Sequence, residues 1–220
     1  MIFAFTLVKS FVMDEKERMI QEQLLDRDIY AGTVIRAMRE VDRSLFVPDD
    51  LKDRAWDDNP LPIGRGQTIS QPYIVAYMAQ EMDLKPDDVV LEVGSGCGYN
   101  AAVLSKMVSH VYSVEIVEWL AKLARKNLMK AGIINVNVRY GNGYEGWFDH
   151  GPYDKIMLTA AAPVIPRPLK EQLKLGGMML APVGSGLQKL MRIEKKAEDE
   201  FVEHDLIPVR FVPMTGEDQG

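Results

Sequence analysis

The chain has 220 residues, 47% hydrophobic and 26% charged, which suits one large domain with a sizeable core. Its formal net charge of −6 argues against nucleic acid as a partner, because phosphate binding usually leaves a basic footprint. A single cysteine excludes an internal disulfide and fits a reducing compartment, so we expect a cytoplasmic protein. The three histidines stand far apart, so no metal site is expected.

The first 13 residues differ in character from the rest of the chain. Residues 1–8 are mostly apolar, but they lack the basic start and the cleavage site of a secretion signal. They are also too few to span a bilayer, so we expect no membrane partner. We interpret residues 1–13 as an extension or a short docking segment, and residues 14–220 as a single domain.

Helical patterns and a loop precede the centre of the chain. Residues 14–29 and 33–41 carry apolar side chains at helical spacing and are predicted to be packing helices. Residues 57–72 are rich in proline and glycine, which predicts a loop. Ser70 is placed as the N-cap of a helix over residues 72–82, since proline is tolerated in a first turn.

The most informative stretch is residues 89–99, an apolar run that breaks into Gly94, Gly96 and Gly98 before a helix-like segment. Glycines allow close approach of a ligand to the backbone, and a helix N-terminus offers unpaired N–H groups. The spacing G-x-G-x-G is not the dinucleotide fingerprint, and no P-loop lysine is present after it. Glu115 lies twenty-one positions after Gly94, where a ribose-binding carboxylate is expected in a βαβ nucleoside site.

The alternation continues to the end of the chain. Strands are predicted over residues 111–114, 136–140, 153–159, 178–183, 188–194 and 205–212, and helices over 117–131 and 166–175, the latter closed by Gly176 and Gly177 as a C-cap. Such βα units succeeded by consecutive strands predict an α/β fold with a mostly parallel sheet and an antiparallel edge.

The glycine motif and the acidic residue after it resemble motif I of class I S-adenosylmethionine (SAM)-dependent methyltransferases. Residues 60–72, Pro-Leu-Pro-Ile-Gly-Arg-Gly-Gln-Thr-Ile-Ser-Gln-Pro, are similar to a signature of the protein-L-isoaspartate O-methyltransferase family. The resemblance covers most of residues 29–213. It implies a Rossmann-like fold with a seven-stranded sheet, helices on both faces and an N-terminal helical extension. Residues 14–86 would form the N-terminal helices and substrate loop, and 87–220 the SAM-binding core.

The resemblance also implies a set of cofactor-binding residues. Glu115 would accept both ribose hydroxyls. Glu92 would orient the amino group of SAM, directly or through water, or else stabilise the turn. Asn142 stands where the family usually has the aspartate that binds adenine, although Gly-Asn-Gly is equally a good turn sequence. The expected cofactor is SAM, with S-adenosyl-L-homocysteine as product, and its ligands are Glu92, Gly94, Ser95, Gly96, Glu115, Asn142 and Gly143.

On the acceptor side, the resemblance implies Ser70 as the catalytic residue and Thr68, Ile69 and Thr159 as substrate-binding residues. The reaction is attack on the methyl group of SAM by the free carboxylate of an isoaspartyl residue in a damaged protein or peptide. That carboxylate is ionised near pH 7, so no strong base is required. Ser70 would donate a hydrogen bond to it, a role that can coexist with helix capping. The methyl ester would then close to a succinimide, which initiates repair.

Two other functions stay open at this point. One is a SAM-dependent methyltransferase with another acceptor, RNA or a small acid. The other is a non-catalytic SAM-binding interaction module, for which the departure at Asn142 is the support. Thr215 lies in a segment that resembles a family element closing over the site. The expected partners are isoaspartyl proteins and peptides, and the expected assembly is a monomer.

Overall fold

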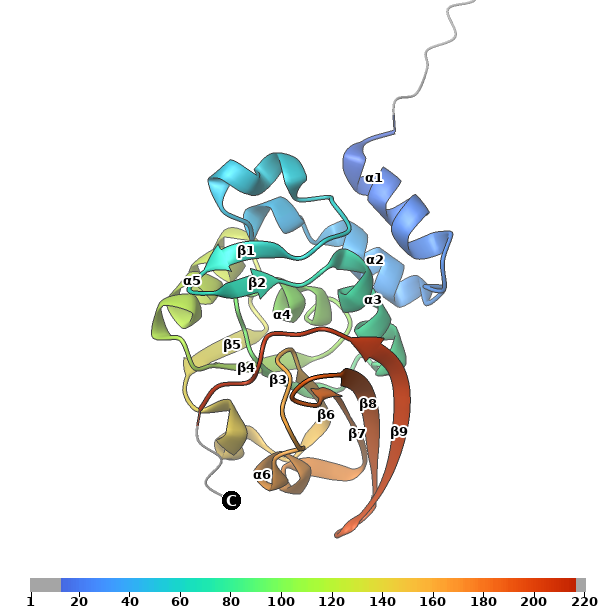
Figure 1. The fold of residues 1–220 in the computed structure, drawn as a ribbon, viewed down its shortest axis with the longest axis vertical. Helices are drawn as coiled ribbons and strands as arrows, with labels where there is room; N and C mark the ends of the chain where they lie inside the picture. The colour runs from blue at the N-terminus through green and yellow to red at the C-terminus, as the bar shows by residue number, and fades with distance from the viewer. Residues whose placement is uncertain (1–12, 217–220) are drawn as a thin grey trace, which may run out of the picture.

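The computed structural model describes residues 13–216 (Figure 1). Apart from Met13, the extension expected at residues 1–13 lies outside the described residues. Within residues 13–216, no helix is both long and apolar enough to cross a membrane.

The centre of the molecule is a seven-stranded sheet in the order β5-β4-β3-β6-β7-β8-β9. The first five strands in this order are parallel, and β8 and β9 run antiparallel at one edge, as expected from the alternating pattern. The chain crosses over between β5 and β6, so the glycine turn after the central strand β3 lies where the strand order reverses. The strands are β3 (Val89–Val93), β4 (His110–Glu115), β5 (Val136–Tyr140), β6 (Tyr153–Leu158), β7 (Leu173–Val183), β8 (Gln188–Ala197) and β9 (Glu200–Val209).

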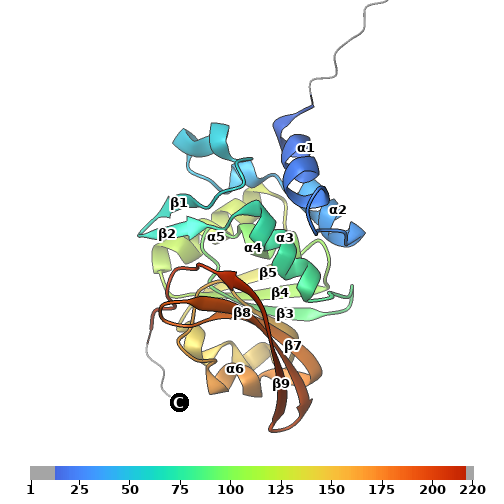
Figure 2. The ribbon, with the colours of Figure 1, turned by 45° about the vertical axis from the view of Figure 1, so that its right-hand side comes forward.

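Helices cover both faces of the sheet. Figure 2 shows α3 (Pro72–Glu81), α4 (Tyr99–Leu104) and α5 (Glu118–Lys130) on one face and α6 (Arg167–Glu171) on the other. Alternate residues of β3 serve two cores, since Val90 packs with the larger helical layer and Leu91 with the cluster that includes Leu169 of α6. The fold is therefore the Rossmann-like class I methyltransferase architecture that the resemblance implies.

The N-terminal elements lie on the same face as α3 and α4 (Figure 2). The first predicted helix divides into α1 and a π-helical η1, and the second is α2 with an apolar face buried through Val34, Ile35 and Met38. Short 3-10 helical turns follow α2 and also lie between β5 and β6. The remaining elements are α1 (Glu15–Met19), η1 (Ile20–Leu25), α2 (Gly32–Glu40), η2 (Arg43–Leu45), η3 (Asp49–Arg54), η4 (Gly143–Glu145) and η5 (Phe148–His150).

Residues 60–72 contain a hairpin where a loop was predicted. Strands β1 (Leu61–Gly64) and β2 (Gln67–Ile69) pair antiparallel. Arg65 and Gly66 have positive φ angles of 57° and 73° and form the tight turn between β1 and β2. The side chains of Leu61, Ile63 and Ile69 are buried, and this burial fixes the pairing register of the two short strands.

The N-terminus of α3 is not capped by Ser70, which corrects the sequence-based assignment. Gln71 is the N-cap residue and makes no side-chain cap hydrogen bond. The cap comes instead from Asp58, whose Oδ1 accepts from the Tyr73 N–H at 3.0 Å and whose Oδ2 accepts from Gln71 Nε2 at 2.7 Å. Capping from a distant residue leaves the Ser70 hydroxyl available for another role.

The helix expected over residues 166–175 is shorter, and Gly176 and Gly177 are not its cap. α6 ends at Glu171, and Leu173 already pairs with Tyr153 as the start of β7. The pairing of β6 and β7 shifts register here, and a Cβ on Gly177 would lie 2.9 Å from the Asp154 carbonyl oxygen. The two glycines therefore lie at a bulge in β7, where the strand changes register against β6.

β9 also differs from the expected strand at residues 205–212. It covers Glu200–Val209 because it forms a hairpin with β8 along most of its length. Residues 210–212 continue beyond the paired region toward the carboxyl ends of β3 and β6, where Ala161 N–H donates to the Val212 carbonyl at 2.8 Å.

Candidate active site

The turn after β3 has glycine at positions 94, 96 and 98 because its backbone has positive φ angles and close neighbours there. Gly94 has φ 103°, and a Cβ atom on it would lie 2.4 Å from Thr159 Oγ1. Gly98 has φ 91°, and a Cβ there would lie 3.2 Å from the carbonyl oxygen of Ala124 in α5. The turn therefore presents bare backbone, which allows a ligand to approach closely.

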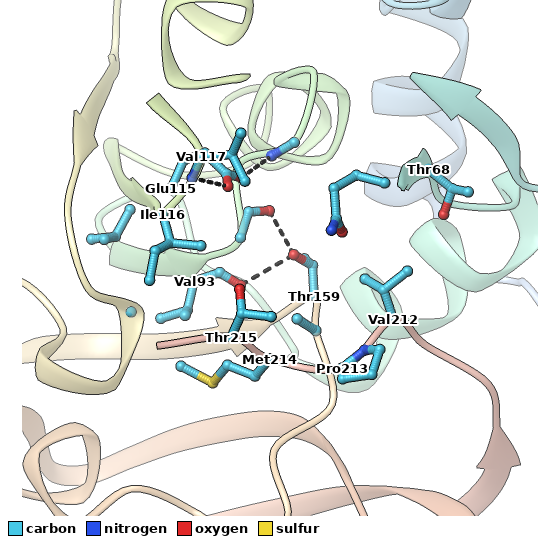
Figure 3. Close-up of a pocket in the computed structure, with 16 residues that line it drawn as sticks. Thr68, Val93, Glu115, Ile116, Val117, Thr159, Val212, Pro213, Met214 and Thr215 are labelled. Atoms are coloured by element: carbon cyan, nitrogen blue, oxygen red, sulfur yellow. Dashed lines mark hydrogen bonds between the residues drawn. The ribbon is translucent and has the colours of Figure 1, made fainter. Parts of the chain in front are cut away.

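Glu115 ends β4 and is 6% exposed. Its Oε2 accepts from the Gly96 N–H at 2.7 Å, and its Oε1 accepts from the Val117 N–H at 2.9 Å (Figure 3). The two backbone bonds orient the carboxylate against the glycine turn. An ionised carboxylate has about four acceptor sites, so Glu115 retains capacity for hydroxyl donors of a ligand.

Glu92 is completely buried and faces α4. Its Oε1 accepts from Asn100 Nδ2 at 2.8 Å, and its Oε2 accepts from the Ser113 hydroxyl, which lies 2.5 Å from Ser95 Oγ. Burial raises the pKa of Glu92 to about 7, although both hydrogen bonds oppose the rise. Of its two expected roles, this geometry fits stabilisation of the turn, with any influence on a ligand passing through Ser95 or Asn100.

Asn142 organises the turn after β5. Its Oδ1 accepts from the Tyr144 N–H at 3.1 Å, and its Nδ2 donates to Glu145 Oε1 at 3.2 Å. The neighbouring Gly143 packs tightly, since a Cβ on it would lie 2.6 Å from Val93 Cγ1. These contacts fit the interpretation of Gly-Asn-Gly as a turn sequence.

The glycine turn, Glu115 and Gly143 surround one cavity, here called the glycine-turn cavity. Figure 3 shows Glu115 and Thr68 on opposite sides of it, with Thr159 between them in this view. Glu92, Ser95 and Asn142 do not line it. Its residues are Gln67, Thr68, Val93, Gly94, Gly96, Val114, Glu115, Ile116, Val117, Gly143, Thr159, Ala160, Val212, Pro213, Met214 and Thr215.

One wall of the glycine-turn cavity is the segment that the family resemblance, and no local pattern, indicated. Thr215 lines it together with Val212, Pro213 and Met214 of the same segment (Figure 3). This segment is held by hydrogen bonds on both sides of Ala161, whose carbonyl accepts from the Met214 N–H at 2.8 Å. Ordinary apolar residues after a strand carry no local signal of a ligand site, so nothing in the sequence pattern points to them.

A second cavity, the Ser70 groove, adjoins the first. It is lined by Arg27, Pro60, Thr68, Ser70, Gln71, Tyr73, Ile74, Thr159, Ile207, Pro208, Val209, Arg210, Phe211 and Val212. Thr68, Thr159 and Val212 line both cavities. A smaller cavity also joins Ile69 and Ser70 to Gly94, Ser95 and Asn100. The structure thus brings the expected substrate residues Thr68, Ile69, Ser70 and Thr159 beside the glycine turn.

Arg43 holds the backbone at Ser70 in place through hydrogen bonds to carbonyl groups. It is completely buried, and its guanidinium donates to the carbonyls of Ala55 at 2.5 Å, Asn59 at 3.0 Å and Ser70 at 3.0 Å. Burial lowers the pKa of Arg43. The Ser70 hydroxyl itself makes no hydrogen bond within residues 13–216. The backbone of Ser70 is therefore held in place, while its hydroxyl has no protein partner within the described residues.

Comparison with known proteins identifies the family of this chain. Residues 14–219 match the family model of protein-L-isoaspartate(D-aspartate) O-methyltransferase. A protein-L-isoaspartate O-methyltransferase 2 of Pelobacter propionicus is 50% identical over 203 residues, which cover 91% of this chain and 90% of the relative. A protein-L-isoaspartate O-methyltransferase of Methanothermobacter thermautotrophicus is 46% identical over 210 residues, 93% of this chain and 97% of the relative.

Two solved structures share the fold over nearly the whole chain. A protein-L-isoaspartate O-methyltransferase superposes with a TM-score of 0.85 and 28% identity, covering 93% of this chain and 67% of the other. A Plasmodium falciparum protein in complex with S-adenosyl-L-homocysteine superposes with a TM-score of 0.81 and 25% identity, covering 92% and 99%. With the family model matching almost all of the described residues, the chain belongs to the protein-L-isoaspartate O-methyltransferase family.

Proposed function

We propose that this protein is the SAM-dependent enzyme that methylates the free carboxylate of L-isoaspartyl residues in damaged proteins and peptides. The observation that carries the proposal is the junction of the two cavities at Thr68 and Thr159. A methyl donor in the glycine-turn cavity and an acceptor in the Ser70 groove would meet there. The family membership selects the isoaspartyl carboxylate over RNA or a small acid, and favours an enzyme over a non-catalytic module.

The glycine-turn cavity fits SAM by its free space beside the backbone and by its hydrogen-bond acceptors. Gly94 and Gly143 leave backbone where a Cβ would clash, and Glu115 keeps acceptor capacity for ribose hydroxyls. When bound, SAM supplies an electrophilic methyl group on a positively charged sulfur. We assign Gly94, Gly96, Glu115 and Gly143 to cofactor contact. Ser95, Glu92 and Asn142 remain proposed cofactor residues, with Glu92 acting as a positioning residue through its network.

On the acceptor side, Ser70 is proposed to donate its unoccupied hydroxyl to the reacting carboxylate. The carboxylate is already ionised near pH 7, so the chain needs to orient it rather than remove a proton. Thr68, Ile69 and Thr159 would shape the junction and exclude water. Thr159 Oγ1 donates to the Gly94 carbonyl at 2.6 Å, so its hydroxyl orients the glycine turn. The backbone amide nitrogen of the next residue would then attack the ester carbonyl, and methanol would leave as the succinimide closes, which permits repair.

Several finer assignments belong to the same proposal. Residues 14–86 would supply the acceptor side and residues 87–220 the SAM-binding core. A cytoplasmic location is supported by the presence of a single cysteine in the sequence. That residue, Cys97, is an unreactive thiol, because burial raises its pKa to about 12. We propose a monomer, which light scattering of the purified protein would test.

The test is methyl transfer from labelled SAM to a peptide with one isoaspartate and to its aspartate twin. We expect labelling of the isoaspartyl peptide alone. Ser70→Ala should lower kcat by about tenfold or more while SAM binding is retained, because it removes one positioned donor. Ser109→Ala, at the opposite end of the strands, is the matched control and should leave kcat unchanged. Failure to label either peptide despite SAM binding would overturn the proposed function.

A further inference from the structure

The Ser70 groove has an unusual charge for this protein. Two of its lining residues, Arg27 and Arg210, are cationic, and its lining residues within 13–216 include no aspartate or glutamate. The chain as a whole carries a net charge of −6. The groove is therefore a locally cationic surface on an acidic protein, which favours anionic ligands.

Only one of these two arginines is already engaged by the protein. Arg27 Nη1 lies 3.3 Å from Asp58 Oδ2, and its guanidinium stacks 3.3 Å from the ring centre of Tyr73. Arg210 is exposed and makes no hydrogen bond or ion pair within the described part of the chain. Asp58 offsets the charge of Arg27, so Arg210 supplies the uncompensated positive charge of the groove.

The position of Arg210 relates it to the reaction site. It lies two residues before Val212, which lines both the groove and the glycine-turn cavity. In extended chain, two residues span about 7 Å. Arg210 is therefore placed to meet a side chain that lies one or two residues from the acceptor in a bound peptide.

The chemistry argues that Arg210 does not pair with the reacting carboxylate itself. The neutral Ser70 hydroxyl orients that group through one hydrogen bond, whereas a guanidinium would form a full ion pair with it before transfer, and this stronger interaction would be lost as the neutral ester forms. Binding that is stronger in the ground state than in the transition state slows the reaction. A carboxylate that keeps its charge throughout, on a neighbouring residue, avoids this loss.

We propose that Arg210 is a specificity residue that selects isoaspartyl peptides with a second carboxylate, from aspartate or glutamate, beside the isoaspartyl residue. The inference rests on the proposed function, because it names the acceptors that the same groove prefers. Partly exposed ion pairs contribute modestly, so the preference over a neutral neighbour should be about two- to fivefold in kcat/KM. It should shrink as ionic strength rises.

The test uses isoaspartyl peptides that differ at one neighbouring position, with glutamate, glutamine or lysine on either side of the acceptor. The wild type should prefer glutamate over glutamine over lysine on at least one side. Arg210→Gln should abolish the order, and Arg210→Glu should reverse it in favour of lysine. Arg167→Glu changes the net charge equally but lies in α6 on the other face of the sheet, so it should keep the wild-type order.

The outcomes separate the two proposals. Methylation of all wild-type peptides at equal rates, or the same order in Arg210→Glu as in the wild type, would overturn the selection by Arg210 alone. Methylation of no peptide would overturn the proposed function and this inference with it. SAM binding measured for each variant confirms that a changed order does not come from misfolding.

Discussion

Gly94 is the position in the site where the structure leaves the least room for a side chain. In Gly94→Ala, the new Cβ would lie 2.4 Å from Thr159 Oγ1, and the residue would have to keep a φ angle of 103°. The oxygen cannot move away freely, because it donates to the Gly94 carbonyl at 2.6 Å. We therefore expect both backbone strain and a steric clash at the turn.

The two contributions can be estimated separately. Backbone strain for a residue other than glycine at such a φ angle costs on the order of 1–3 kcal/mol. Overpacking typically adds about 1–3 kcal/mol. Gly132→Ala is the matched control, because Gly132 has φ 68° and no atom lies within 4 Å of the added Cβ. It should cost only about 1–2 kcal/mol, from the left-handed backbone alone.

The assay is urea unfolding of Gly94→Ala, Thr159→Ala and the double variant, with SAM binding measured by calorimetry. Thr159→Ala removes the oxygen that clashes, so the double variant should be more stable than the sum of the single effects predicts, by about 1–3 kcal/mol. SAM affinity should fall in Gly94→Ala and stay unchanged in Gly132→Ala. Equal destabilisation by Gly94→Ala and Gly132→Ala, with additive effects at Thr159, would refute the reasoning.

Two further predictions concern buried charges that support the site. The pKa of Glu92, raised from 4.5 to about 7, means that the folded protein holds this proton more tightly than the unfolded chain does. The stability from this group is therefore complete below pH 4.5 and is lost as the pH rises through 7, by roughly 3 kcal/mol. Glu92→Gln should flatten the urea-unfolding profile over that window, and parallel profiles would contradict the assignment. Arg43→Lys keeps the charge but lacks the planar fork that reaches the Ala55, Asn59 and Ser70 carbonyls, so it should lower the free energy of unfolding by about 1–3 kcal/mol. It should also lower kcat with SAM affinity unchanged, and a loss of SAM affinity equal to the loss of kcat would show that its effect is not confined to the acceptor side.

Local patterns carried much of the fold and part of the site. The alternation of strand and helix patterns predicted a mostly parallel sheet with an antiparallel edge, because the spacing of apolar residues differs between helices and strands that bury one or both faces. The Gly94–Gly98 spacing predicted the tight turn, because positive φ angles select glycine. Glu115 was found from its spacing alone and lies against that turn, since the ends of adjacent parallel strands meet at one edge.

Features that depend on partners far apart in the sequence could not be predicted in this way. Asp58, not Ser70, caps α3, because the choice between two oxygens depends on how the hairpin packs beside the helix. The carboxylate of Glu92 accepts hydrogen bonds from Asn100 and Ser113, which only the packing of α4 on β3 reveals. Residues 212–215 wall the glycine-turn cavity through hydrogen bonds to Ala161. Composition and periodicity report what a residue's own backbone and burial require, whereas hydrogen-bond partners and cavity walls arise from where separate segments come together in space.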